Sequence, residues 1–211
     1  MNDYNTGPHQ DAIGTGPDID KETGSTEISL EYFTVSEGKL ITLYILSFGL
    51  YGIYWFYKNW KLQQVMMDKK IFPLMRAIFS IFFTHALFRR IDKSAEQLEK
   101  KHRFNANLLA TFFVAAVVIG NLLDRVLISA GILPGLSEPT VIIISLIIFM
   151  LSAYPLTVVQ ATVNRINDDI LGYLNHKYSL WNYLLIVVGS VFWLMLALGL
   201  LAESMGLVPQ V

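Results

Sequence analysis

The sequence predicts an all-α, multi-pass helical membrane protein, and the composition and the spacing of the charges are the observations that predict it. Of the 211 residues, 54% are hydrophobic and 16% are charged, whereas a soluble domain carries about 25% charged residues. Four long stretches contain no acidic or basic residue, and a helix needs about 20 largely apolar residues to cross a bilayer. We therefore expect four clear transmembrane helices. Their expected bounds are about residues 40–57, 105–123, 140–159 and 180–202.

Aromatic residues gather at the end of the first expected span. Trp and Tyr favour the headgroup level of a bilayer, because each ring has an apolar body and one polar group. We interpret the cluster as an interfacial anchor in preference to a cation-binding aromatic box. Its members are Tyr51, Tyr54, Trp55, Tyr57 and Trp60.

Residues 71–88 form an ambiguous apolar segment. Their Ile, Leu and Phe residues favour insertion by about 3–6 kcal/mol in total. Arg76 near the middle opposes insertion by about 2.5–3.5 kcal/mol, and Pro73 and the polar residues oppose it further. The segment is either re-entrant or interfacial, or it is a fifth span. Residues 88–103 follow as an amphipathic helix with a polar face exposed to water.

The chain before the first span is polar and acidic. Residues 1–39 hold eight Asp and Glu against two Lys, with Gly-Pro turn dipeptides. Such a composition buries too little apolar surface to offset the entropy lost on ordering. We expect residues 1–35 to be a disordered acidic tail with no cleavable signal peptide, and residues 36–205 to form the membrane domain.

The third span is expected to kink at Pro155 and to continue beyond the membrane. Gln160, Asn164 and Asn167 then form a polar line along one side of the helix. The basic residues of 58–70 and 89–103 favour one cytoplasmic side for both segments. This predicts four full spans with both termini outside. The alternative is five spans with the N-terminus inside.

Residues 33–62 carry the aromatic run Gly49-Leu-Tyr-Gly-Ile-Tyr-Trp-Phe-Tyr-Lys58. This run resembles the signature G-[LI]-Y-x-[IL]-Y-W-[FL]-Y-K of a group of small, uncharacterised bacterial integral membrane proteins. Residues 72–79 and 163–167, Arg89-Arg90 and Trp181-Asn182 also resemble that group. The resemblance implies the bacterial cytoplasmic (inner) membrane and carries no known chemistry, so it assigns no functional residue.

Several function classes are excluded by residue content. The chain has no cysteine, so it has no disulfide framework and no Cys-ligated metal. Its net charge of −1 provides no positive electrostatic potential that would attract nucleic acid. None of the protease, hydrolase, P-loop or dinucleotide motifs is present. We expect no enzymatic activity, no cofactor and no metal site.

The candidate functional residues are polar: Arg76, Gln160, Asn164 and Arg165. The favoured hypothesis is a non-catalytic protein that acts through helix packing and a cytoplasmic basic, amphipathic surface. Its expected partners are the lipid bilayer, including anionic headgroups, and a membrane protein or a second copy of the chain. The alternative is a small transporter or channel component that uses a polar face around Arg76, Gln160 and Asn164.

Overall fold

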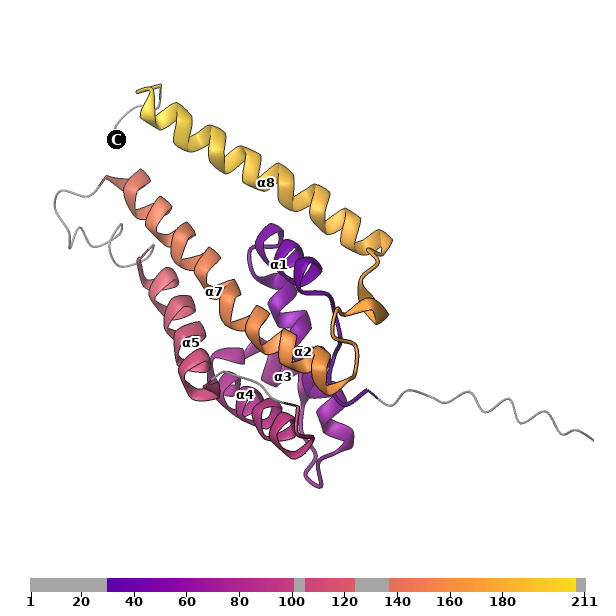
Figure 1. Ribbon diagram of the computed structural model, residues 1–211. Helices are drawn as coiled ribbons and strands as arrows, with labels where there is room; N and C mark the ends of the chain where they lie inside the picture. Colours follow the sequence, from indigo (N-terminus) through magenta and orange to yellow (C-terminus); the bar gives the residue numbers. More distant parts are fainter. Residues whose placement is uncertain (1–29, 101–104, 124–136, 208–211) are drawn as a thin grey trace, which may run out of the picture.

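A computed structural model describes residues 30–100, 105–123 and 137–207, and every regular element in these ranges is a helix (Figure 1). The all-α class is therefore confirmed for the described part of the chain. The elements in order are α1 (Glu37–Leu46), α2 (Leu50–Val65), α3 (Pro73–Ile78), α4 (Ser80–Gln97), α5 (Ala106–Leu122), α7 (Glu138–Ile166), the short 3-10 helix η2 (Tyr173–Asn175) and α8 (Leu180–Ser204).

Helix α7 is the centre of the packing. It contacts α1, α4 and α5 along its length, whereas α8 lies on the other side and packs mainly against α1 (Figure 1). The largest fully buried side chains include Trp55 and Trp60 of α2, Tyr32 of the stretch before α1, and Phe88 of α4. The core therefore lies at the end of the molecule where α2, α4 and the second half of α7 meet.

The expected single helix over residues 40–57 is interrupted. α1 ends at Leu46 and α2 begins at Leu50, because Phe48 and Gly49 have φ of 51° and 86°. The N–H of Gly49 donates to the carbonyl of Tyr44 at 2.8 Å, and that of Phe48 donates to the carbonyl of Ile45 at 3.1 Å. These two bonds form a Schellman motif, which ends a helix. Residues 37–65 are thus two helices joined by a tight turn.

The ambiguous segment 71–88 is also divided. Pro73 starts the short helix α3, and the backbone bends at Phe79 before α4 begins at Ser80. α4 continues as far as Gln97, so the expected amphipathic helix of 88–103 is the second half of α4, and residues 101–104 lie outside the described residues. The segment is therefore not one straight helix.

Two helices of the described part are long and apolar enough to cross a membrane. They are residues Pro139–Ile166 and Leu180–Ser204, whose apolar 18-residue stretches have mean hydropathies of 2.4 and 2.6, respectively. The expected extension beyond residue 159 is present, since α7 runs unbroken through Pro155 to Ile166. α5 is apolar but has only 17 residues. Four clear spans are thus not found in the described residues.

The ordered domain includes more of the N-terminus than expected. Tyr32 and Val35 have no exposed surface, so the boundary expected after residue 35 lies too far along the chain. Residues 1–29 of the expected tail lie outside the described residues.

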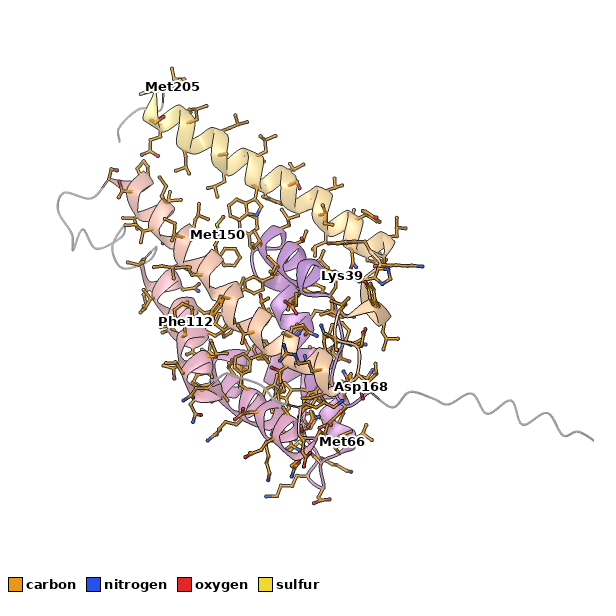
Figure 2. The ribbon with its side chains drawn as sticks, viewed as in Figure 1. Lys39, Met66, Phe112, Met150, Asp168 and Met205 are labelled. Atoms are coloured by element: carbon orange, nitrogen blue, oxygen red, sulfur yellow. The ribbon has the colours of Figure 1, made fainter. Side chains whose placement is uncertain are left out.

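One end of the molecule collects the N-terminal residues and the ends of three helices. Glu31 accepts a hydrogen bond from Gln63, near the end of α2, and its carboxylate accepts one from Ser94 of α4. Figure 2 shows Met66, just after α2, and Asp168, just after α7, at this same end. The last turn of α8 lies at the opposite end (Figure 1). This arrangement differs from four full spans with both termini on one side.

We predict that residues 64 and 97 are accessible from the same side of a membrane. Both Gln64 and Gln97 are exposed, and the chain has no cysteine, so Gln64→Cys and Gln97→Cys each give a single label site. An impermeant maleimide should modify both variants in inside-out vesicles and neither in intact cells. Labelling from opposite sides would contradict the structure.

Helix α8 touches α1 at a glycine. A Cβ atom at Gly189 would lie 2.0 Å from the carbonyl oxygen of Leu46. Close by, the indole N–H of Trp193 donates to the carbonyl of Ile45 at 3.0 Å, and its ring stacks on Phe48 with centroids 4.9 Å apart. Both contacts use the end of α1, whose last carbonyls lack helical partners. α8 is therefore attached at the α1–α2 turn.

We predict that Gly189→Ala destabilises the protein in detergent by about 1–3 kcal/mol, because the added methyl group separates α8 from α1. The control is Gly199→Ala, since nothing lies within 4 Å of a Cβ atom there. That variant should gain up to about 1 kcal/mol from helix propensity. Thermal unfolding followed by Trp fluorescence measures both effects, and equal stability of the two variants would refute the close contact.

Candidate functional site

A short irregular stretch of the N-terminus, residues 31–35, is buried between helices. We call it the N-terminal segment. It forms no helix or strand, so its backbone groups need other hydrogen-bond partners. Side-chain amides supply them, and we call these side chains the amide cluster. The cluster consists of Asn59 and Gln63 of α2, Gln160 and Asn164 of α7, and Asn167 and Asn175, which follow α7.

Helical spacing explains how α7 presents its part of the cluster. Gln160, Asn164 and Asn167 lie at i, i+4 and i+7, on one face of α7 or just beyond its end. The amide of Gln160 donates to the carbonyl of Phe33 at 3.2 Å, and that of Asn164 donates to the carbonyl of Val35 at 3.0 Å. Gln160 also donates to Asn164 at 2.7 Å. The expected polar line thus holds the backbone of the N-terminal segment.

The other amides complete the contacts. Asn167 accepts from the N–H groups of Glu31 and Tyr32 and donates to the carbonyl of Tyr32 at 2.7 Å. Asn59 of α2 accepts from the N–H of Phe33 at 3.1 Å.

The hydroxyl group of Tyr32 lies 2.9 Å from the hydroxyl group of Ser94. Burial raises the pKa of the Tyr32 hydroxyl to about 12. The group is therefore protonated at physiological pH.

The loop after α7 closes over the N-terminal segment. The carboxylate of Asp169 accepts from the N–H groups of Tyr173 and Leu174 and from the hydroxyl of Thr34. A Cβ atom at Gly172, where φ is +67°, would lie 2.5 Å from the backbone nitrogen of Ser36. Lys39 is buried, and its ammonium group donates to Asn175 and to a carbonyl of the same loop, each at 2.7 Å.

The structure separates the predicted site residues. Gln160 and Asn164 are fully buried and bonded to each other. Arg165 is exposed and lines a shallow cleft on the other side of α7. Arg76 makes no hydrogen bond to the amide cluster within the described part of the chain. The expected polar face around Arg76, Gln160 and Asn164 is therefore not assembled.

The guanidinium group of Arg76 instead lies on aromatic rings. Its central carbon is 4.4 Å from the ring centroid of Trp60 and 5.1 Å from that of Phe83. Burial lowers the pKa of Arg76, and the charge of the nearby Arg90 lowers it further. The Nε of Arg90 donates to Gln63 at 2.9 Å. Two cations therefore lie close together along α2.

The expected aromatic anchor is mostly core. Trp55 and Trp60 have no exposed surface, and Tyr51 is nearly buried. The indole N–H of Trp55 donates to Gln160 at 2.5 Å, which explains its inward position. Only Tyr54, at 45% exposed, and the half-buried Tyr57 reach the surface. These rings position α2 in the core, and two of them could contact headgroups.

Sequence reasoning missed the N-terminal segment and Asn59, Gln63, Asn175 and Asp169, which help to hold it. The one signal was Tyr32-Phe33-Thr34-Val35, an apolar run at the end of an otherwise polar tail. Nothing in the spacing showed which backbone the amides of α7 would bind. Because those amides are bonded to main chain, the arrangement orders the N-terminal segment.

Among the described residues, no group of three or more His, Asp or Glu side chains is placed to hold a metal ion. No family model, curated protein or solved structure matches this chain.

We predict that Asn164→Leu destabilises the protein by about 2 kcal/mol or more, because the carbonyl of Val35 then lies buried without its donor. Detachment of the N-terminal segment should also expose Lys39, so trypsin should cleave after this residue faster than in the wild type. Asn107→Leu is the control, since Asn107 is exposed on α5, and it should change stability by less than about 0.5 kcal/mol. Unchanged proteolysis of Asn164→Leu would argue against the amide cluster as the holder of this segment.

Proposed function

We propose that this chain is a non-catalytic, multi-pass protein of the bacterial cytoplasmic membrane that acts through a basic surface in contact with anionic lipid headgroups. The observation that carries the proposal is the exposure of α8. Only Gly189 of its 25 residues is buried, although an 18-residue stretch of the helix has a mean hydropathy of 2.6. The core helix of a soluble protein would bury such a surface, whereas a bilayer accepts it.

Helices α3 and α4 supply the surface on which lipid headgroups would lie. Phe72 is 77% exposed and Phe82 is 70% exposed, and the intervening Leu74, Met75 and Ile78 are also exposed. Exposed basic residues lie on α2, on the connection between α2 and α3, and on the second half of α4. They are Lys61, Lys69, Lys70, Arg89 and Lys93. Apolar residues beside basic ones are typical of a helix that lies in a membrane interface and attracts anionic lipid.

The geometry gives less support to a transporter or channel component. That hypothesis needs polar groups that face a path, but Gln160 and Asn164 are buried and bonded to the N-terminal segment. A membrane-protein partner or a second copy of the chain would bind the apolar surface of α8. We therefore place lipid contact first and such a partner second.

We predict that anionic lipid stabilises the protein. In nanodiscs with one quarter phosphatidylglycerol, the unfolding temperature should exceed that in phosphatidylcholine alone, and 1 M salt should remove the difference. The variant Lys69→Gln/Lys70→Gln/Lys93→Gln should lose most of the gain, since each basic residue near the surface contributes about 1 kcal/mol. Equal unfolding temperatures in both lipids would contradict the proposal.

A further inference from the structure

Two arginine side chains, Arg76 of α3 and Arg90 of α4, contact neighbouring positions of α2. The guanidinium group of Arg76 has aromatic rings against it, Trp60 and Phe83. In the part of the chain that the structure describes, no acceptor takes a hydrogen bond from Arg76, and no carboxylate forms an ion pair with Arg76 or Arg90. The N–H groups along the edge of a guanidinium are arranged to bind the oxygens of a phosphate. Stacking fixes the plane of the group and leaves that edge available.

The positions of the two arginines are set by α2. Arg76 lies on Trp60 and Arg90 donates to Gln63, and these two residues of α2 are one helical turn apart. Arg90 is close enough for its charge to disfavour the charged form of Arg76. A bound anion would remove this repulsion, and a phosphate diester can accept hydrogen bonds from both groups.

An apolar cavity of about 640 Å³ begins one turn of α2 away from this pair. Phe56 of α2 lines it, and so do Ile78 and Phe79, which follow Arg76 along the chain. Its other walls come from α5 and α7, including Gly120 and Phe149. None of the lining side chains carries a charge. The volume lies within the range of about 300–1,000 Å³ that is usual for small-molecule sites.

The occupant that fits both features has a phosphate at one end and an apolar chain at the other. We propose that one anionic phospholipid binds here, with its phosphate on Arg76 and Arg90 and one acyl chain in the cavity. The two helix interruptions, at Ser47–Gly49 and at Phe79, both border this cavity. The inference rests on the proposed function and deepens it, because it replaces a general attraction to anionic lipid with a single bound molecule.

The test compares lipid retention among matched variants purified in mild detergent. Native mass spectrometry should show one phospholipid on the wild type. Arg76→Leu and Arg90→Leu should each lower the retained fraction about ten-fold. Gly120→Leu should lower it by filling the cavity, since a Cβ atom at this position meets only Ile148, at 3.7 Å. The control Lys177→Leu removes one exposed positive charge that belongs neither to this pair nor to the proposed basic surface, and it should retain lipid.

Adding single compounds back to the delipidated wild type shows whether the site binds a phospholipid or a free phosphate ion. Dioleoylphosphatidylglycerol should restore the unfolding temperature at one equivalent, and inorganic phosphate and dioleoylphosphatidylcholine should not. Equal recovery with inorganic phosphate would mean that the arginines bind a free anion, and equal recovery with phosphatidylcholine would mean that the site ignores charge. Either result overturns the proposal, as does a bound lipid that survives Arg76→Leu.

A variant that keeps the positive charge distinguishes loss of the lipid contact from loss of lipid through misfolding. Arg76→Lys retains the cation but not the planar fork, so it should fold and bind the lipid about ten-fold more weakly. Unchanged binding in this variant would refute the proposed contact. Stabilisation by anionic nanodiscs without a retained lipid would overturn this inference alone. The absence of both effects would overturn the proposed function as well.

Discussion

The buried backbone of residues 31–35 is the constraint on which the rest of the molecule depends. Each buried N–H or carbonyl without a partner costs about 1–3 kcal/mol, and this segment has neither helical nor sheet bonds to satisfy its groups. Side chains of α2 and α7 satisfy them instead, at helical spacing. The amides therefore restrain the relative rotation of α2 and α7, because a rotation of either helix would leave several buried groups unpaired.

The position of the N-terminal segment also determines the path of the next helices. Since residue 35 is held beside the end of α7, α1 must begin at that end of the molecule. With 10 residues α1 extends about 15 Å, roughly half the thickness of a hydrocarbon core. The Schellman turn then sends α2 back toward the start. The α1–α2 turn therefore lies away from the N-terminal segment, where it contacts α8 and borders the apolar cavity.

Hydropathy and helix signals predicted the helices that are defined by residues close together in the sequence. α7 and α8 follow from long apolar runs, and in the structure the side chain of Ser179 caps the start of α8 by accepting from the N–H of Asn182. The turn at Phe48 and Gly49 was missed because apolar content carries no information about φ. The polar line of Gln160 and Asn164 was recognised, but its partner is 127 to 130 residues away along the chain. Pairing over such separations depends on packing that the pattern of one helix does not encode.

The long separation also gives the protein an order of assembly. The N-terminal segment leaves the ribosome early, yet Asn164, Asn167 and Asn175 are made 129 to 141 residues later than the groups that they bind. At about 5–20 residues per second, that delay is on the order of ten seconds. Until it ends, residues 31–35 have no amides of α7 to bind, and the α1–α2 turn lacks the α8 contact at Gly189. The N-terminal end of the domain is thus completed only after its C-terminal helices have been synthesised.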